Sequence, residues 1–348
     1  MTVTITPRGG RAAGIATVLV AVVTAVAPMP RWTVERWYSN GVFPPLQHAL
    51  TSFSNLVPFA LFDALWIGAT AAAGAWAYRR LRARPLSRTL KRMAFEGTTA
   101  AAAVYLVFLV TWAFNYRRVP LRERLDFQPT RITRTAAGAL GTRVATQLNT
   151  LYADAHRQPT SLPALAEAFA SAQRSLGAPW TILPARPKQT LLGAYFHQTG
   201  ITGMTDPFLL ETMIAPDLLD VEKPFVVAHE WAHLAGYADE SEANFVGWLA
   251  CQHGDPSAQY SAALMMIGYV RPPGVSLRQA LAIGPRTDLF AIQERYAHTS
   301  RTLQMAAREG YNAYLKANRV HAGVVSYDLV VQLVLGSAFD RNGNPILR

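Results

Sequence analysis

The residues of this chain with the clearest chemical meaning are His229, Glu230 and His233, in the sequence His-Glu-Trp-Ala-His. On a helix the two histidines lie one turn apart on the same face, so both imidazoles can bind a single zinc ion. Glu230 projects beside them, toward the position of a zinc-bound water. The spacing therefore predicts the core of a zinc peptidase site, with Zn2+ as the cofactor and Glu230 as the catalytic base.

The flanking residues predict where this helix begins and ends. Asp220 is suited to an N-cap, and Pro224 is tolerated near a helix start. Gly236 follows three residues after His233, and glycine adopts without penalty the left-handed backbone angles that end many helices. We therefore expect the chain to turn back sharply at Gly236.

A second helix over residues 237–250, capped by Asp239, carries the candidates for a third zinc ligand. A helical rotation of about 100° per residue places Glu242 on the apolar face and Glu240 on the opposite face. A carboxylate on an apolar face needs a partner, because burying an unpaired charge is costly. We therefore expect Glu242 to be the third ligand, beside His229 and His233.

Four alternatives to this ligand set remain open. Asp239 and Glu242 fit a capping box, in which Glu242 binds only backbone donors. Asp239 also stands six residues after the second histidine, where H-E-x-x-H-x-x-G-x-x-H enzymes place their third ligand. Finally, both histidines could be hydrogen-bonded core residues without a metal. Glu240 is a further candidate to replace Glu242.

At these residues the chain resembles the domain of unknown function 3810 family, membrane-anchored proteins expected to be zinc metallopeptidases. The resemblance covers residues 224–251, residues 114–121 (Phe-Asn-Tyr-Arg-Arg-Val-Pro-Leu) and residues 326–331 (Ser-Tyr-Asp-Leu-Val-Val). It implies zinc at His229, His233 and Glu242, with Glu230 as base, in a gluzincin-like site. The stretch around Glu211 departs from the family pattern, so the resemblance implies no role for it.

The N-terminal third contains three apolar stretches, at residues 12–30, 57–78 and 97–116. Each is long enough, or nearly so, to cross a bilayer, and we expect three transmembrane helices. A cleaved signal peptide ending near Ala27 is an alternative for the first stretch. Asp63 lies toward the outer end of the second, where we expect it to have a structural pairing, for example with an arginine.

The distribution of charge predicts the orientation in the membrane. Seven cations crowd the loop between the second and third spans: Arg79, Arg80, Arg82, Arg84, Arg88, Lys91 and Arg92. Such a loop stays in the cytoplasm, as do Arg8 and Arg11, so everything after residue 116 should lie outside the cytoplasmic membrane. This loop contributes seven cations to the formal net charge of +11, and we expect them to contact anionic lipid headgroups. The charge therefore needs no nucleic-acid partner, and we expect none.

The sequence thus predicts a mainly α protein with two parts. Residues 1–116 form the membrane anchor, and residues 117–348 form an extracytoplasmic, α+β, zincin-like domain with a small sheet. Strands are expected at residues 190–197 and 208–214, with substrate bound along the sheet edge. Amphipathic helices are expected at residues 130–156 and 161–176. Further helices are expected at residues 257–270, 286–299, 301–318 and 326–339, the last as an apolar core helix. Cys251, the only cysteine, is expected in the core.

These patterns favour one function over two others. A multi-pass zinc peptidase would hydrolyse peptide or protein substrates outside the membrane by Glu230-assisted attack of water. The alternatives are a zinc-containing sensor or assembly protein that binds peptide or cell-wall ligands without turnover, and a scaffold without metal. Residue type alone makes five side chains candidates to stabilise an oxyanion: Tyr195, His197, Tyr237, His253 and His298.

Overall fold

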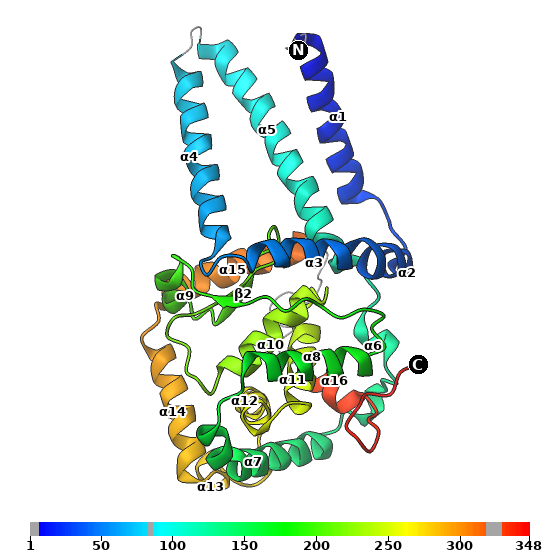
Figure 1. The fold of residues 1–348 in the computed structure, drawn as a ribbon, viewed down its shortest axis with the longest axis vertical. Coiled ribbons are helices and arrows are strands. Elements are labelled where there is room, and N and C mark those ends of the chain that lie inside the picture. Colours follow the sequence, from blue (N-terminus) through cyan, green and yellow to red (C-terminus); the bar gives the residue numbers. More distant parts are fainter. Residues whose placement is uncertain (1–6, 83–85, 318–328) are drawn as a thin grey trace.

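Three long helices near the N-terminus project together from one side of a compact helical body (Figure 1). The computed structural model describes residues 7–82, 86–317 and 329–348. The projecting helices are α1 (Pro7–Val26), α4 (Leu61–Leu81) and α5 (Leu86–Thr111). They match the three predicted apolar stretches in order, although Arg84 of the basic loop lies outside the described residues.

By length and composition, one described helix, over Ser87–Thr111, is apolar enough to cross a membrane. A second candidate arises if Gly10–Val26 and Arg31–Ser54, which meet at a bend of 115°, are counted as one span. The structure therefore supports one or two apolar helices that could anchor the chain. The prediction of three spans goes beyond this finding.

Between α1 and α4 the chain runs across the base of the projecting helices (Figure 1). This segment consists of α2 (Arg31–Thr33), the π-helix η1 (Val34–Val42) and α3 (Phe43–Ser54). After α5, the short helices η2 (Ala113–Arg117), α6 (Leu121–Arg124) and η3 (Pro129–Arg131) lead into the body.

The body is mainly helical, as predicted. Helices α7 (Arg134–Arg157) and α8 (Leu162–Ser175) begin at side-chain caps, because Thr133 accepts from the Ala136 amide and Ser161 from the Ala164 amide. Helices α12 (Pro256–Met266), α13 (Leu277–Ala280), α14 (Ile283–Ala297), α15 (Arg301–Ala317) and α16 (Leu329–Gly336) follow the metal-site region. Residues 318 and 326–328, which belong to two predicted helices, lie outside the described part.

The predicted strand at residues 190–197 is wrong, since Gly193–Thr199 forms helix α9. Three short strands make the only sheet in the described residues: β1 (Pro187–Lys188), β2 (Gly203–Thr205) and β3 (Thr212–Ile214), in the order β1-β3-β2. β1 runs parallel to β3, whereas β2 is antiparallel, with Met204 opposite Met213. Of the second predicted strand only β3 is extended.

One hydrophobic core joins the helices of the body. Trp231, Phe169 and Phe245 are fully buried in it, and Cys251 is also buried, as predicted. The core extends to Leu109 and Trp112 at the end of α5. The projecting helix α5 and the body are therefore packed as one unit at this point.

Helix α4 is attached to the body by two buried carboxylates. Glu211 accepts hydrogen bonds from the Leu61 and Phe62 amides, at 3.1 and 2.8 Å, and pairs with Lys188 at 2.5 Å. Asp63, in the first turn of α4, accepts from the Thr190 hydroxyl at 2.7 Å and the Leu191 amide at 2.8 Å. Asp63 thus has the predicted structural pairing, but with a loop of the body in place of an arginine.

This attachment predicts that Glu211→Ala is strongly destabilising. The change leaves Lys188 buried without its partner, which costs about 3 to 5 kcal/mol, and removes the acceptor at the start of α4. Thermal and denaturant unfolding of the detergent-solubilised chain measure the effect. Asp220→Ala is the matched control, because the Asp220 side chain is 83% exposed in its pair with Lys223. Equal midpoints for the two variants would contradict the role given to Glu211.

Candidate metal site

The helix that carries both histidines, α10 (Lys223–Leu234), is buried along most of its length. Pro224 lies in its first turn as expected, but the N-cap is Glu222 and not the predicted Asp220. The helix ends as the sequence predicts. Gly236 has φ of +79°, and the Tyr237 amide donates to the Ala232 carbonyl, so the chain reverses within three residues of His233.

The two histidines of α10 converge with one acid from the next helix, α11 (Glu240–Gln252). The imidazole rings lie 4.8 Å apart between centroids. One carboxylate oxygen of Glu240 lies 3.3 Å from Nε2 of His229, and the other lies 3.7 Å from Nε2 of His233. The candidate ligand atoms of the three residues all lie within 4.8 Å of one another.

The expected third ligand, Glu242, does not reach this cluster. Its Oε1 accepts a hydrogen bond of 2.6 Å from the Leu121 amide, at the start of α6. Burial raises the pKa of the Glu242 carboxyl to about 7, with the Asp239 charge acting in the same direction. Asp239 is the N-cap of α11, accepting from the Ser241 and Glu242 amides, and it is not part of the cluster either.

The sequence did not indicate which glutamate faces the histidines, because most of α11 is buried on both of its faces. The face with Glu240, Asn244 and Gly247 has little apolar character, yet it packs against α10. Gly247 permits the close approach, since a Cβ there would lie 2.9 Å from the backbone nitrogen of His229. The apolar face packs elsewhere in the core. Apolarity therefore did not indicate which face meets the histidines, whereas Gly247, two turns after Glu240, was the available signal.

Contacts around His233 set the direction of its ring. Its Nδ1 donates to the Tyr237 carbonyl at 2.8 Å, which leaves Nε2 directed toward Glu240. The Trp112 ring packs edge-on against the imidazole, with centroids 5.8 Å apart. A backbone acceptor on the second ring nitrogen is the arrangement that orients histidine ligands in metal sites.

Arg118 holds the turn that supplies this acceptor. Its Nη1 donates to the carbonyls of Ala235 and Gly236, at 3.2 and 3.0 Å, and its guanidinium lies over the Tyr237 ring. The remaining donors pair with Glu35 of η1, at 2.8 and 2.7 Å. Residues 114–121, singled out in the sequence without a stated role, therefore form the support of the turn between α10 and α11.

Glu230 lies on α10 beside the histidines and is held by strand β2. The Thr205 hydroxyl donates to Oε2 of Glu230 at 2.7 Å. A Cβ on Gly203 would lie 2.6 Å from Oε1, so the strand leaves space only for glycine there. Burial raises the pKa of the Glu230 carboxyl to about 7, although His233 acts in the opposite direction.

Three of the five oxyanion candidates make side-chain contacts with residues other than the two histidines. The Tyr237 side chain is buried under Arg118, the His197 ring pairs with Asp217 at 2.7 Å, and His253 contacts Ser171. Tyr195 is 45% exposed on α9, and His298 is the C-cap of α14. Of these residues, Tyr237 bonds to the histidine pair through its backbone carbonyl, which accepts from His233.

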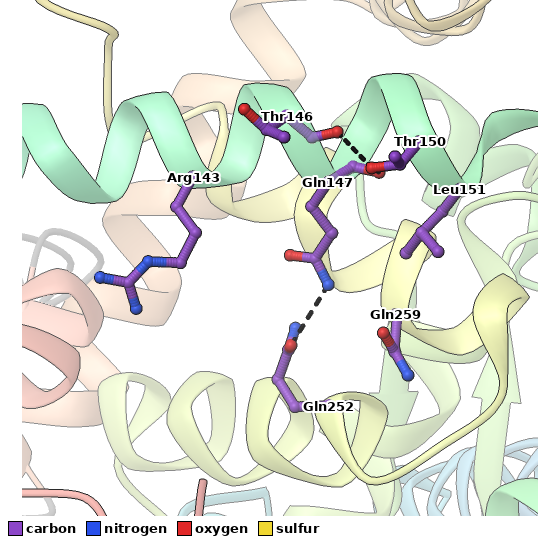
Figure 2. A pocket seen from close by; sticks show the side chains of 7 residues that line it. All are labelled: Arg143, Thr146, Gln147, Thr150, Leu151, Gln252 and Gln259. Atoms are coloured by element: carbon purple, nitrogen blue, oxygen red, sulfur yellow. Dashed lines mark hydrogen bonds between the residues drawn. The ribbon is translucent and has the colours of Figure 1, made fainter. Parts of the chain in front are cut away.

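An open polar hollow lies between α7, α11 and α12, away from the histidines. Figure 2 shows its lining, in which the amides of Gln147 and Gln252 face each other across a hydrogen bond of 3.2 Å. Gln252 is twelve residues after Glu240 on α11, about 18 Å along the helix axis. This hollow therefore has no part in the metal site. It is lined by Arg143, Thr146, Gln147, Thr150, Leu151, Gln252 and Gln259.

Comparison with known proteins identifies the family. The family model described as "Protein of unknown function (DUF3810)" matches residues 38–335. The chain belongs to this family. The matched range includes both helices of the candidate site and the Arg118 segment. No curated protein and no solved structure matches the chain.

The geometry predicts that Glu240 and Glu242 differ in their effect on metal. Glu240→Gln removes a charged donor from the cluster and should lower zinc affinity on the order of 100-fold or more. Glu242→Gln should retain zinc, because a glutamine can still accept the hydrogen bond from the Leu121 amide and so leave α11 in place. Competition with a chromophoric chelator measures both affinities in the purified chain. A loss of zinc in Glu242→Gln but not in Glu240→Gln would contradict this assignment.

A separate prediction concerns Arg118. Lysine keeps the positive charge but cannot bind Glu35 and two carbonyls at once. Arg118→Lys should therefore loosen the turn and lower zinc affinity about 10- to 100-fold, as changes around metal ligands do. The control is Arg143→Lys, which lies in the distant hollow of Figure 2. Unchanged zinc affinity in Arg118→Lys would show that the turn holds without the guanidinium.

Proposed function

We propose that this protein is a membrane-anchored zinc peptidase that acts outside the cytoplasmic membrane. The observation that carries the proposal is the convergence of His229, His233 and Glu240, with their ligand atoms within 4.8 Å. Two imidazole nitrogens and a carboxylate oxygen are a donor set that zinc accepts, and three protein ligands are typical of catalytic rather than structural zinc sites. The donor chemistry therefore fits the metal that the sequence predicts.

Zinc at this position would supply a Lewis acid that polarises a scissile carbonyl and makes water acidic near neutral pH. The residues of the chain would do the rest. Glu230, fixed by Thr205, would accept a proton and pass it to the leaving amine. Because Thr205 and Gly203 restrict its carboxylate, Glu230 would hold that proton at a defined place beside the histidines.

Strand β2 supports an extended mode of substrate binding. It stands at one edge of the three-stranded sheet, is antiparallel to β3 and packs against α10. A peptide that pairs with this edge would run directly past Glu230, because Gly203 and Thr205 contact that side chain. We therefore expect main-chain pairing to contribute to affinity, as it does when a strand is added to a sheet edge.

The exposed surface of α1, α4 and α5 supports insertion of all three helices into the membrane. Their outward side chains are apolar and have no protein covering, which is costly in water but favourable in lipid. With the Arg-rich loop between α4 and α5 in the cytoplasm, the body would lie on the opposite side. The exposed apolar residues include Ile15, Leu19, Val20, Val22, Val23 and Val26 of α1, Leu65, Trp66 and Ile67 of α4, and Val104, Val107 and Val110 of α5.

Replacing Glu230 by Gln tests the proposed chemistry. The amide keeps the shape and the Thr205 contact but cannot accept a proton, so hydrolysis should fall by about 10²- to 10⁴-fold while zinc remains bound. The purified chain is incubated with a diverse peptide library, and cleavage is read by mass spectrometry beside zinc analysis.

Three results distinguish the candidate functions. Cleavage by the parent and its loss in Glu230→Gln supports the peptidase. Zinc binding with no cleavage by the parent, together with retention of peptides, supports the sensor or assembly function. A chain purified without chelators that holds no zinc and takes up none contradicts both functions.

A further inference from the structure

The segment between α1 and α4 has both of its ends at the base of the projecting helices. The chain bends through 115° between Gly10–Val26 and Arg31–Ser54, and α4 begins at Leu61, so the segment crosses the base (Figure 1). We call residues 31–59 the juxtamembrane platform. If α1 and α4 enter the membrane, connectivity places both ends of the platform at the membrane surface.

The face of α3 against the body combines Phe43, fully buried in the core, with buried polar side chains. Of these polar side chains, Gln47 donates to the Leu183 carbonyl at 2.8 Å, and Thr51 donates to the Leu210 carbonyl at 3.0 Å. Both side chains are fully buried. The opposite face, which carries the exposed Phe53, therefore points away from the body. In water, a helix normally buries its apolar face and exposes its polar one.

Large apolar side chains along the platform are more than half exposed. Trp32 is 62% exposed, Trp37 67%, Phe53 56%, Leu56 77% and Phe59 57%. Arginine accompanies them, with the Arg36 guanidinium 5.6 Å from the Trp37 ring centroid. Tryptophan with arginine is typical of the lipid headgroup layer, where the indole body is apolar and the edge is polar.

We propose that the juxtamembrane platform lies in the lipid headgroup layer and holds the metal site beside the membrane surface. The inference rests on the proposed membrane insertion of α1, α4 and α5. A lipid surface is favoured over a protein partner because chain connectivity brings the platform to the bilayer whatever else binds there. Leu191, 73% exposed and bonded through its amide to Asp63 of α4, extends the apolar edge onto the body.

The platform and the metal site are directly connected. Trp112 follows the apolar helix by one residue, and its ring packs against His233. Glu35 of the platform pairs with Arg118, which holds the turn after α10. The site therefore lies within two contacts of the lipid-facing segment, which favours substrates that are themselves close to the membrane, such as segments flanking a membrane anchor.

The lone cysteine of the chain permits a direct test. Cys251 is fully buried, so Trp37→Cys and Phe53→Cys can be labelled selectively with an environment-sensitive fluorophore, with the parent chain as blank. The full chain is reconstituted in vesicles of phosphatidylcholine and phosphatidylglycerol that carry nitroxides at the headgroup or in the middle of the acyl chain. Val104→Cys reports the span, and Ala153→Cys on α7, at the far end of the body, reports water (Figure 1).

The proposal expects both platform labels to be quenched mainly by headgroup nitroxide, Val104→Cys mainly by acyl-chain nitroxide, and Ala153→Cys by neither. Platform labels that behave like Ala153→Cys, while Val104→Cys is quenched, would overturn the inference and leave the anchor standing. If Val104→Cys also escapes quenching, the membrane anchor itself is wrong, and with it the platform. Because the two platform positions are exposed, each variant should fold, and either alone decides the outcome.

Discussion

The buried pair between Arg118 and Glu35 is the interaction on which the geometry of the histidine cluster most depends. Neither charge could remain buried alone, and together they leave two guanidinium donors for the carbonyls of Ala235 and Gly236. The turn between α10 and α11 is fixed by these bonds. The Tyr237 carbonyl, which orients His233, belongs to the same turn. The imidazole direction is thus determined by residues far away in the sequence, next to the projecting helices.

Local signals in the sequence were sufficient for the helices of the site and insufficient for its third ligand. The histidine spacing, Gly236 and the Asp239 cap each act within a few residues, and the structure contains all three. The third ligand depends on which face of α11 meets α10. On a helix that is buried all round, that choice is made by the shape of Gly247 and not by hydrophobicity. A helical wheel could not supply this information.

The same distinction explains the errors elsewhere in the fold. Residues 193–199 have the aromatic composition of a strand, yet they form α9, which packs against α15, a helix more than a hundred residues later. Asp63 accepts hydrogen bonds from the Thr190 hydroxyl and the Leu191 amide, just before α9, where sequence alone suggested an arginine. The Asp239 cap and the helix periodicity are local and were predictable, although the cap of α10 is Glu222 and not Asp220. Partners of buried polar groups are chosen by tertiary packing, which the sequence does not display.

Glu240 and Glu242 are two residues apart and serve opposite sides of one helix. Glu240 faces the histidines, whereas Glu242 binds the Leu121 amide next to the Arg118 segment. Because α11 is closely packed on α10, a shift of the helix that moved one of these acids would also move the other. If the cluster binds a metal, that binding and the packing of α11 against the Leu121 segment would be linked in free energy, and linkage is reciprocal. A zinc ion would stabilise the packing of the chain beside the projecting helices by as much as that packing strengthens the site.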